Sequence, residues 1–147
     1  MNKNVLIVDD EPYAIDWIIE FTRERGFKPI ICQTFGEAFD IINAQRHFAA
    51  SVIDMNIPIM PSDEHIISSK GEQYKKYHGL LLAHELRDFG NSKHSVIIFT
   101  VHDDRQITEI AEVLSIQYII KGKVKRIKEA LIRQFDYIKT HYPQLFM

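Results

Sequence analysis

The chain has 147 residues, which is enough for one domain with a substantial hydrophobic core, and its apolar content is ordinary for a globular protein. Its 18 Lys and Arg residues nearly balance its 20 Asp and Glu residues, which argues against binding nucleic acid through bulk positive charge. The single cysteine, Cys32, excludes an internal disulfide and a thiolate metal site.

Short apolar runs alternate with helical patterns along the whole chain. The apolar runs predict strands over residues 4–8, 29–32, 49–54, 95–100 and 117–120. Apolar positions spaced three and four apart predict helices from Pro12 to near Gly26 and over residues 35–42, 80–87, 104–114 and 124–142. This alternation is typical of an α/β fold with a doubly wound parallel sheet and helices on both faces. We therefore predict one domain over residues 1–147, with the flavodoxin-like strand order 2-1-3-4-5.

Residues 60–78 interrupt the alternation. The segment contains Pro61, Gly71, several serines and a cluster of lysines and tyrosines, and its pattern predicts neither a strand nor a helix. We interpret it as an insertion between the third strand and the third helix. Long loops in compact domains are usually functional or mobile. Two hypotheses stay open: a tolerated surface insertion, or a segment that lies over or beside the functional site and controls access to it.

Chemically reactive side chains follow four of the five predicted strands. Asp9 and Asp10 follow the first strand, Asp54 ends the third, Thr100 ends the fourth and Lys121 follows the fifth. Ligands of open α/β sheets bind beyond the carboxyl ends of the strands, so we expect these side chains to share one edge of the sheet, the rim. Each has a simpler interpretation alone, such as a turn aspartate or a solvated lysine. Their joint placement favours a site.

The residue types at the rim suit phosphoryl transfer with a divalent cation. Carboxylates held together repel each other unless a cation is present, and their hard oxygen atoms suit Mg²⁺. A carboxylate beside Mg²⁺ can attack phosphorus and form an aspartyl-phosphate. A lysine ammonium and a threonine hydroxyl can stabilise the phosphoryl oxygens.

These residues, together with the run Asp54-Met55-Asn56-Ile57-Pro58, resemble the response-regulator receiver domain of two-component signalling, over essentially all of the chain. The resemblance implies that Asp54 is the phosphoacceptor and that Asp10 and Asp54 bind Mg²⁺ directly. It further implies that Asp9 acts on the metal through water and that Asn56 supplies its backbone carbonyl.

The resemblance also implies roles on the phosphoryl side of the site. Lys121 and Thr100 would contact the phosphoryl group, and Thr100 would act as a switch. Tyr118 stands where the family places its aromatic switch residue. An equally weighted alternative for Tyr118 is a half-buried residue that favours a strand.

As a receiver domain, the chain would catalyse only its own phosphorylation and dephosphorylation. The phosphoryl donor would be a sensor histidine kinase or a histidine phosphotransfer protein, and a downstream effector and a homodimer are open as further partners. The sequence begins without the apolar region of a signal peptide, and no stretch approaches transmembrane length. We therefore expect a cytoplasmic protein that binds neither membrane nor nucleic acid.

Three features depart from the family pattern. Gly122 follows Lys121 where the family usually has proline, often after a cis peptide bond, which would cost about 3 kcal/mol without proline. We therefore expect a trans bond or visible strain. Val101 follows Thr100 where the family prefers a small side chain, and could narrow the path to Asp54. The third departure is the long segment 60–78.

Two other functions compete with phosphoacceptance. A haloacid-dehalogenase-type phosphatase also uses a strand-end aspartate, but it needs a second aspartate two residues later, where this chain has Asn56. A receiver-like scaffold that works without phosphorylation would be favoured if Asp9, Asp10 or Lys121 were missing, and all three are present.

Overall fold

Parallel strands form one sheet at the centre of the computed structural model, which describes residues 1–101 and 104–147. The sheet has the order β2-β1-β3-β4-β5, and each neighbouring pair is parallel. This confirms the predicted α/β class and the strand order 2-1-3-4-5. The strand bounds are β1 Asn4–Val8, β2 Lys28–Cys32, β3 Ala50–Asp54, β4 Val96–Thr100 and β5 Gln117–Ile120.

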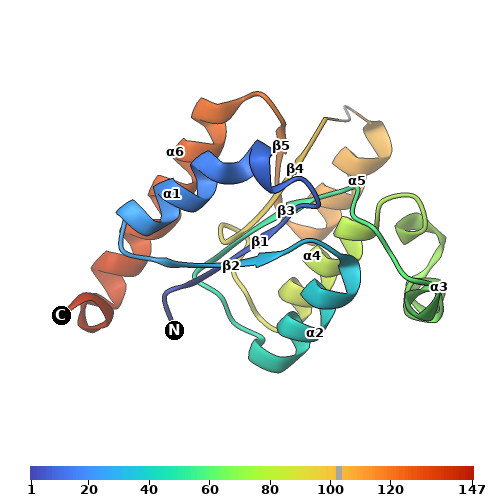
Figure 1. The fold of residues 1–147 in the computed structure, drawn as a ribbon, viewed down its shortest axis with the longest axis horizontal. Coiled ribbons are helices and arrows are strands. Elements are labelled where there is room, and N and C mark those ends of the chain that lie inside the picture. Colours follow the sequence, from blue (N-terminus) through green and yellow to red (C-terminus); the bar gives the residue numbers. More distant parts are fainter. Residues whose placement is uncertain (102–103) are drawn as a thin grey trace.

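Helices cover both faces of the sheet (Figure 1). One face carries α1 (Asp16–Glu24) and α6 (Val124–His141), whose apolar sides pack on alternate residues of the central strands. The other face carries α2 (Phe35–Gln45), α4 (His78–Asp88) and α5 (Arg105–Leu114), which build a second core. Strands buried on both faces explain why β1, β3 and β4 read as continuous apolar runs.

Side-chain caps mark where α2 and α5 begin. The Thr34 hydroxyl accepts a hydrogen bond from Glu37 N at 3.2 Å and caps α2. Asp104 caps α5 by accepting from Gln106 N at 2.8 Å. The chain after Pro12 first forms a short 3₁₀ turn, Pro12–Ile15, so that α1 begins four residues later than proline alone suggests.

The segment between β3 and α4 contains regular structure that the sequence pattern did not predict. Helix α3 spans Glu64–Lys70, between short 3₁₀ turns at Pro61–Asp63 and Glu72–Tyr74. It lies beside α4, on the outer side of the helical layer (Figure 1). Ile67, Tyr74 and Tyr77 are each only 3% exposed and join the core around α4. Packing against α4, rather than local propensity, therefore stabilises this short helix.

A hydrogen-bonded chain of side chains fastens the segment to α4. The Tyr74 hydroxyl lies 2.7 Å from His84 Nδ1, and His84 Nε2 lies 3.0 Å from Asp88 Oδ2. Burial raises the pKa of the Tyr74 phenol above its usual value, so the hydroxyl keeps its proton at neutral pH. The segment is thus tied to the body of the domain through both apolar and polar contacts.

The backbone beyond β5 adopts the first of the two geometries expected at Lys121-Gly122. Among the described residues no peptide bond is cis, and Gly122 has a φ of +95°. Glycine enters this region without the steric cost that a Cβ atom would add. Within the described ranges, no helix has both the length and the apolar character needed to cross a membrane.

Candidate functional site

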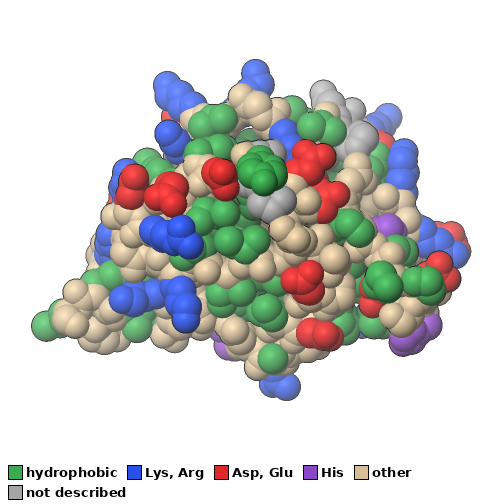
Figure 2. Space-filling model, in the orientation of Figure 1, with side chains coloured by type: hydrophobic (Ala, Val, Ile, Leu, Met, Phe, Trp, Pro, Cys, Tyr) green, Lys and Arg blue, Asp and Glu red, His purple; other side chains and the backbone are tan. Residues whose placement is uncertain are grey.

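The carboxyl ends of β1, β3, β4 and β5 meet at one edge of the sheet (Figure 1). Val8 pairs with Ile53, which places Asp9 beside Asp54. Thr100 pairs with Ile120, and Lys121 N donates a hydrogen bond to Thr100 O at 2.7 Å. The register of the sheet therefore brings the strand-end residues to the same rim. Acidic side chains gather beside the loop that follows β1 (Figure 2).

Three carboxylates converge at this rim. Asp9, Asp10 and Asp54 each place one carboxylate oxygen within 4.8 Å of the others. Asp9 and Asp54 are buried, whereas Asp10 is exposed. Asp9 Oδ1 accepts from Glu11 N at 2.8 Å, and Asp54 Oδ1 accepts from Asn56 N at 3.3 Å. Backbone donors thus orient both buried carboxylates and leave their Oδ2 atoms turned to other partners.

The Lys121 ammonium lies between the two buried carboxylates. Its Nζ is 3.1 Å from Asp54 Oδ2 and 3.1 Å from Asp9 Oδ2. Burial raises the pKa of Asp54, the Lys121 charge lowers it, and the Asp9 charge raises it further; the net shift is upward. Burial lowers the pKa of Lys121, but the charges of Asp54 and Asp9 outweigh that effect and raise it. Lys121 is therefore cationic at neutral pH and partly neutralises the acidic cluster.

The donor set of the rim fits a divalent cation. Three carboxylates and one ammonium leave an excess of negative charge, and Asp9 Oδ2 is buried and meets Lys121 as an ion pair without hydrogen-bond geometry. Its lone pairs are therefore available to a cation. Carboxylate oxygens and an exposed side at Asp10 suit Mg²⁺, because this ion prefers oxygen ligands and keeps several of its waters.

The two residues predicted to act as switches, Thr100 and Tyr118, lie on neighbouring strands at different distances from the rim. Thr100 is buried at the end of β4, next to the rim. Tyr118 is partly buried near the start of β5, paired with Ile98, and packs against the core that contains α4 and α5. Val101 is 68% exposed, so its side chain is directed largely to solvent.

Gly79 is a residue of the site that sequence reasoning did not assign. It lies in the first turn of α4, where Gly79 N donates to Met55 O at 3.2 Å. A Cβ atom at this position would overlap the Asp54 carbonyl oxygen and crowd the Asp54 carbonyl carbon at 3.0 Å. Glycine therefore lets α4 begin directly against the backbone of Asp54. A glycine that opens a helical pattern was the signal in the sequence.

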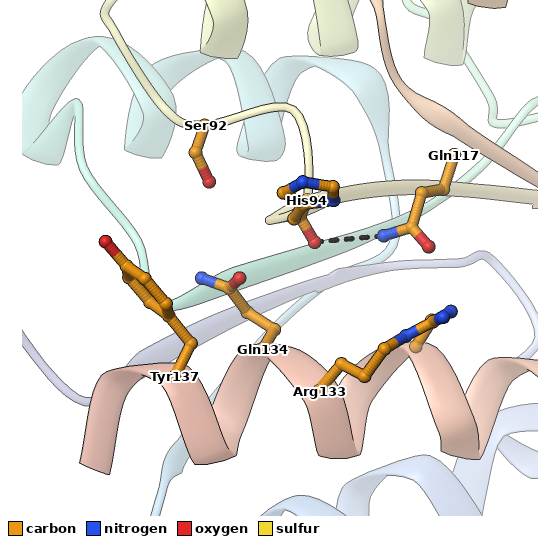
Figure 3. A pocket seen from close by; sticks show the side chains of 7 residues that line it. Ser92, His94, Gln117, Arg133, Gln134 and Tyr137 are labelled. Atoms are coloured by element: carbon orange, nitrogen blue, oxygen red, sulfur yellow. Dashed lines mark hydrogen bonds between the residues drawn. The ribbon is translucent and has the colours of Figure 1, made fainter. Parts of the chain in front are cut away.

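A surface pocket of about 530 Å³ lies at the opposite end of the strands (Figure 3). It is bounded by α6, the segment before β4 and the first residue of β5. Gln117 Nε2 donates to His94 O at 2.9 Å, and Gln134 Nε2 donates to Ala49 O at 2.9 Å. These bonds hold loops to the sheet and to α6. None of the predicted site residues lines this pocket.

Comparison with known proteins gives similarity in structure alone. No family model and no curated protein sequence matches the chain. A CheY-like receiver domain protein from Methanospirillum hungatei is 20% identical, with a TM-score of 0.64 over 93% of this chain and 99% of that one. A receiver domain protein from Clostridium thermocellum is 18% identical, with a TM-score of 0.66 over 93% and 97%.

The chain has the fold of a response-regulator receiver domain. A third similar structure is the response regulator TrrA from Thermotoga maritima in complex with Mg(2+)-BeF, which is 18% identical, with a TM-score of 0.64 over 90% of this chain and 98% of that one. In this receiver fold, the carboxylates and Lys121 lie at the rim formed by the carboxyl ends of the strands. Such a rim is where open α/β sheets bind their ligands.

Proposed function

We propose that the protein is a phosphoacceptor switch of a two-component phosphorelay, with Asp54 as the phosphorylated residue. The observation that carries this proposal is the buried Asp54 carboxylate, placed within 4.8 Å of two other carboxylates and 3.1 Å from Lys121 Nζ. A carboxylate held at such a site is activated as a nucleophile rather than being a solvated surface group.

The reaction would transfer a phosphoryl group from a phosphohistidine. An Asp54 carboxylate oxygen forms the new O–P bond while the N–P bond of the donor breaks. The donor imidazole keeps the electron pair of that bond and takes up a proton. The donor would be a sensor histidine kinase or a histidine phosphotransfer protein, and the chain would catalyse only its own phosphorylation and dephosphorylation.

Asp10, Asp54 and the Asn56 backbone carbonyl would hold Mg²⁺ directly, with Asp9 acting through water. When bound, Mg²⁺ supplies positive charge that offsets the carboxylates and the phosphoryl oxygens. The exposure of Asp10 supports its place in this set, because Asp10 is open to solvent and can bind a hydrated ion. The structure of TrrA, which has this fold, was determined in complex with Mg(2+)-BeF, and this supports a magnesium site here.

Lys121 would move from pairing with Asp54 to pairing with the phosphoryl oxygens. Its ammonium already lies 3.1 Å from the attacking side chain, so it needs no large rearrangement. Thr100 would donate its hydroxyl to the phosphoryl group, since it ends the neighbouring strand at the same rim. Tyr118 would then respond to the displacement of Thr100 and transmit the change towards α5, β5 and α6. A downstream effector or a second copy of the chain would bind the surface formed by α5, β5 and α6.

Mass spectrometry after incubation with Mg²⁺ and acetyl phosphate tests the proposal. We expect a mass increase of one phosphoryl group, which disappears in Asp54→Asn and when the metal is chelated. Asp88→Asn, which changes an exposed carboxylate on α4, is the matched control and should still be phosphorylated. Absence of the adduct in the wild-type protein would overturn the proposal and favour a scaffold that works without phosphorylation.

A further inference from the structure

The segment that leads into α4 is fastened to the first turn of α5. The Tyr77 hydroxyl donates a hydrogen bond to Asp104 Oδ2 at 2.9 Å, and Lys76 Nζ lies 3.3 Å from the same oxygen. Asp104 is also the N-cap of α5, and its Oδ1 accepts from Gln106 N at 2.8 Å. One carboxylate therefore closes the first turn of α5 and connects it to the segment before α4.

The Tyr77 hydroxyl is the stronger of the two anchors. The Tyr77 residue is 3% exposed and belongs to the core around α4, so its hydroxyl is held in place. The Lys76 side chain is 64% exposed, and ion pairs in such positions contribute little. The Gln106 N–H and then the Tyr77 hydroxyl keep the pKa of Asp104 below its usual range, so the acceptor is ionised at neutral pH. Hydrogen bonds to ionised acceptors are stronger than those between neutral groups.

The same segment touches the backbone that carries Asp54. His78 Nδ1 lies 3.3 Å from Ile57 O, and Gly79 N donates to Met55 O at 3.2 Å. Tyr77 is thus two residues from the glycine that packs on the Asp54 carbonyl. On the other side, Asp104 follows the switch candidate Thr100 by four positions. The Tyr77–Asp104 contact therefore bridges the chain after Asp54 and the chain after Thr100.

We propose that Tyr77 is a positioning residue for the switch: through Asp104, its hydroxyl holds α5 in the unphosphorylated arrangement. This inference rests on the proposed function of Asp54. A contact made in one arrangement favours that arrangement, so its loss increases the population of the alternatives. When the phosphoryl group draws Thr100 towards the rim, the start of α5 has to move as well. The hydrogen bond from Tyr77 to Asp104 opposes this movement of α5.

Tyr77→Phe isolates the hydroxyl, because the ring stays in the core. Tyr137→Phe is the matched control, since it removes a hydroxyl from the half-exposed Tyr137 on α6, at the opposite end of the sheet. Lys76→Ala tests the exposed partner alone. Asp104→Ala removes the shared acceptor, and the double variant Tyr77→Phe/Asp104→Ala tests coupling, because residues in contact give non-additive effects. Urea unfolding verifies that each variant is folded.

Two measurements are made on each variant. The first is amide hydrogen exchange in the first turn of α5, without any phosphodonor. We expect exchange about threefold to tenfold faster in Tyr77→Phe, as the loss of one hydrogen bond implies. The second is the rate of phosphorylation by acetyl phosphate with Mg²⁺, which we expect to rise about threefold or more in Tyr77→Phe. Tyr137→Phe should match the wild type in both, Lys76→Ala should show a smaller effect, and the double variant should match Asp104→Ala in phosphorylation rate.

The two measurements separate this inference from the proposed function. If the wild type is phosphorylated and Tyr77→Phe keeps the wild-type phosphorylation rate, the inference is overturned, even where exchange changes. If the effects of Tyr77→Phe and Asp104→Ala on the rate are additive, the coupling through Asp104 is wrong. If the wild type accepts no phosphoryl group, the proposed function fails, and the exchange data alone decide whether Tyr77 holds α5.

Discussion

Gly79 shows how closely single residues constrain the rim. Gly79→Ala places a Cβ atom against the Asp54 carbonyl, so α4 or the end of β3 must shift. We expect a loss of roughly 1–3 kcal/mol in the free energy of unfolding, as for other overpacked sites. Urea unfolding measures this loss.

Gly36 in α2 is the matched control for that measurement. A Cβ atom there would meet the nearest atoms of Asp63 at 3.5 Å, an ordinary contact distance. Because alanine favours a helix more than glycine does, we expect Gly36→Ala to be neutral or stabilising by up to about 1 kcal/mol. Equal losses in the two variants would contradict the role assigned to Gly79.

The buried thiol of Cys32 makes stability depend on pH in the alkaline range. Burial, and then the charge of Glu37, raise the pKa of Cys32 from 9.0 to about 11. The folded state thus favours the neutral thiol, and this contribution is present below pH 9 and is lost as the pH rises towards 11. We expect the wild type to lose stability relative to Cys32→Ala over that range, as measured by urea unfolding at several pH values. Parallel pH profiles of the two proteins would refute this.

At the scale of elements, the strands and helices that depend on local sequence patterns were predictable from the sequence. The five strands were predictable because each is a short apolar run, buried on one or both faces, and the helices of the regular alternation because their apolar residues recur every three to four positions. The convergence of Asp9, Asp54 and Lys121 followed from parallel strands ending at one edge. These features depend on periodicity and topology, not on detailed packing.

Features that depend on contacts between distant parts of the chain could not be predicted from the sequence pattern. Helix α3 has seven residues, too few for a helix to be stable by itself, and depends on burying Ile67 beside α4. The Tyr77–Asp104 contact joins residues 27 positions apart. The prediction that residues 60–78 lack regular structure was wrong for this reason: tertiary packing decides the conformation where local propensity is weak.

At the scale of the whole molecule, the repulsion between carboxylates at the rim destabilises the folded state, and packing elsewhere in the fold must offset it. Asp9 and Asp54 are buried with one ammonium between them, and Asp10 adds a further charge. The two cores on either side of the sheet supply the stability that keeps these groups together. Binding a cation to the folded state relieves the repulsion, and a ligand that binds only the folded state stabilises it by mass action. Stability and metal binding should therefore be linked across the entire protein.

Asp10→Ala tests this link between the rim and global stability. In the wild type, Mg²⁺ at a hundredfold excess over its Kd should raise the free energy of unfolding by about 2.7 kcal/mol. Asp10→Ala should be at least as stable as the wild type without metal, because it removes one of three like charges, and should lose most of the response to Mg²⁺. Urea unfolding with and without Mg²⁺ at constant ionic strength measures both effects.

Asp136→Ala, on an exposed position of α6, controls for the loss of an acidic residue and should keep the full response. A wild-type response that survives in Asp10→Ala would place the metal elsewhere.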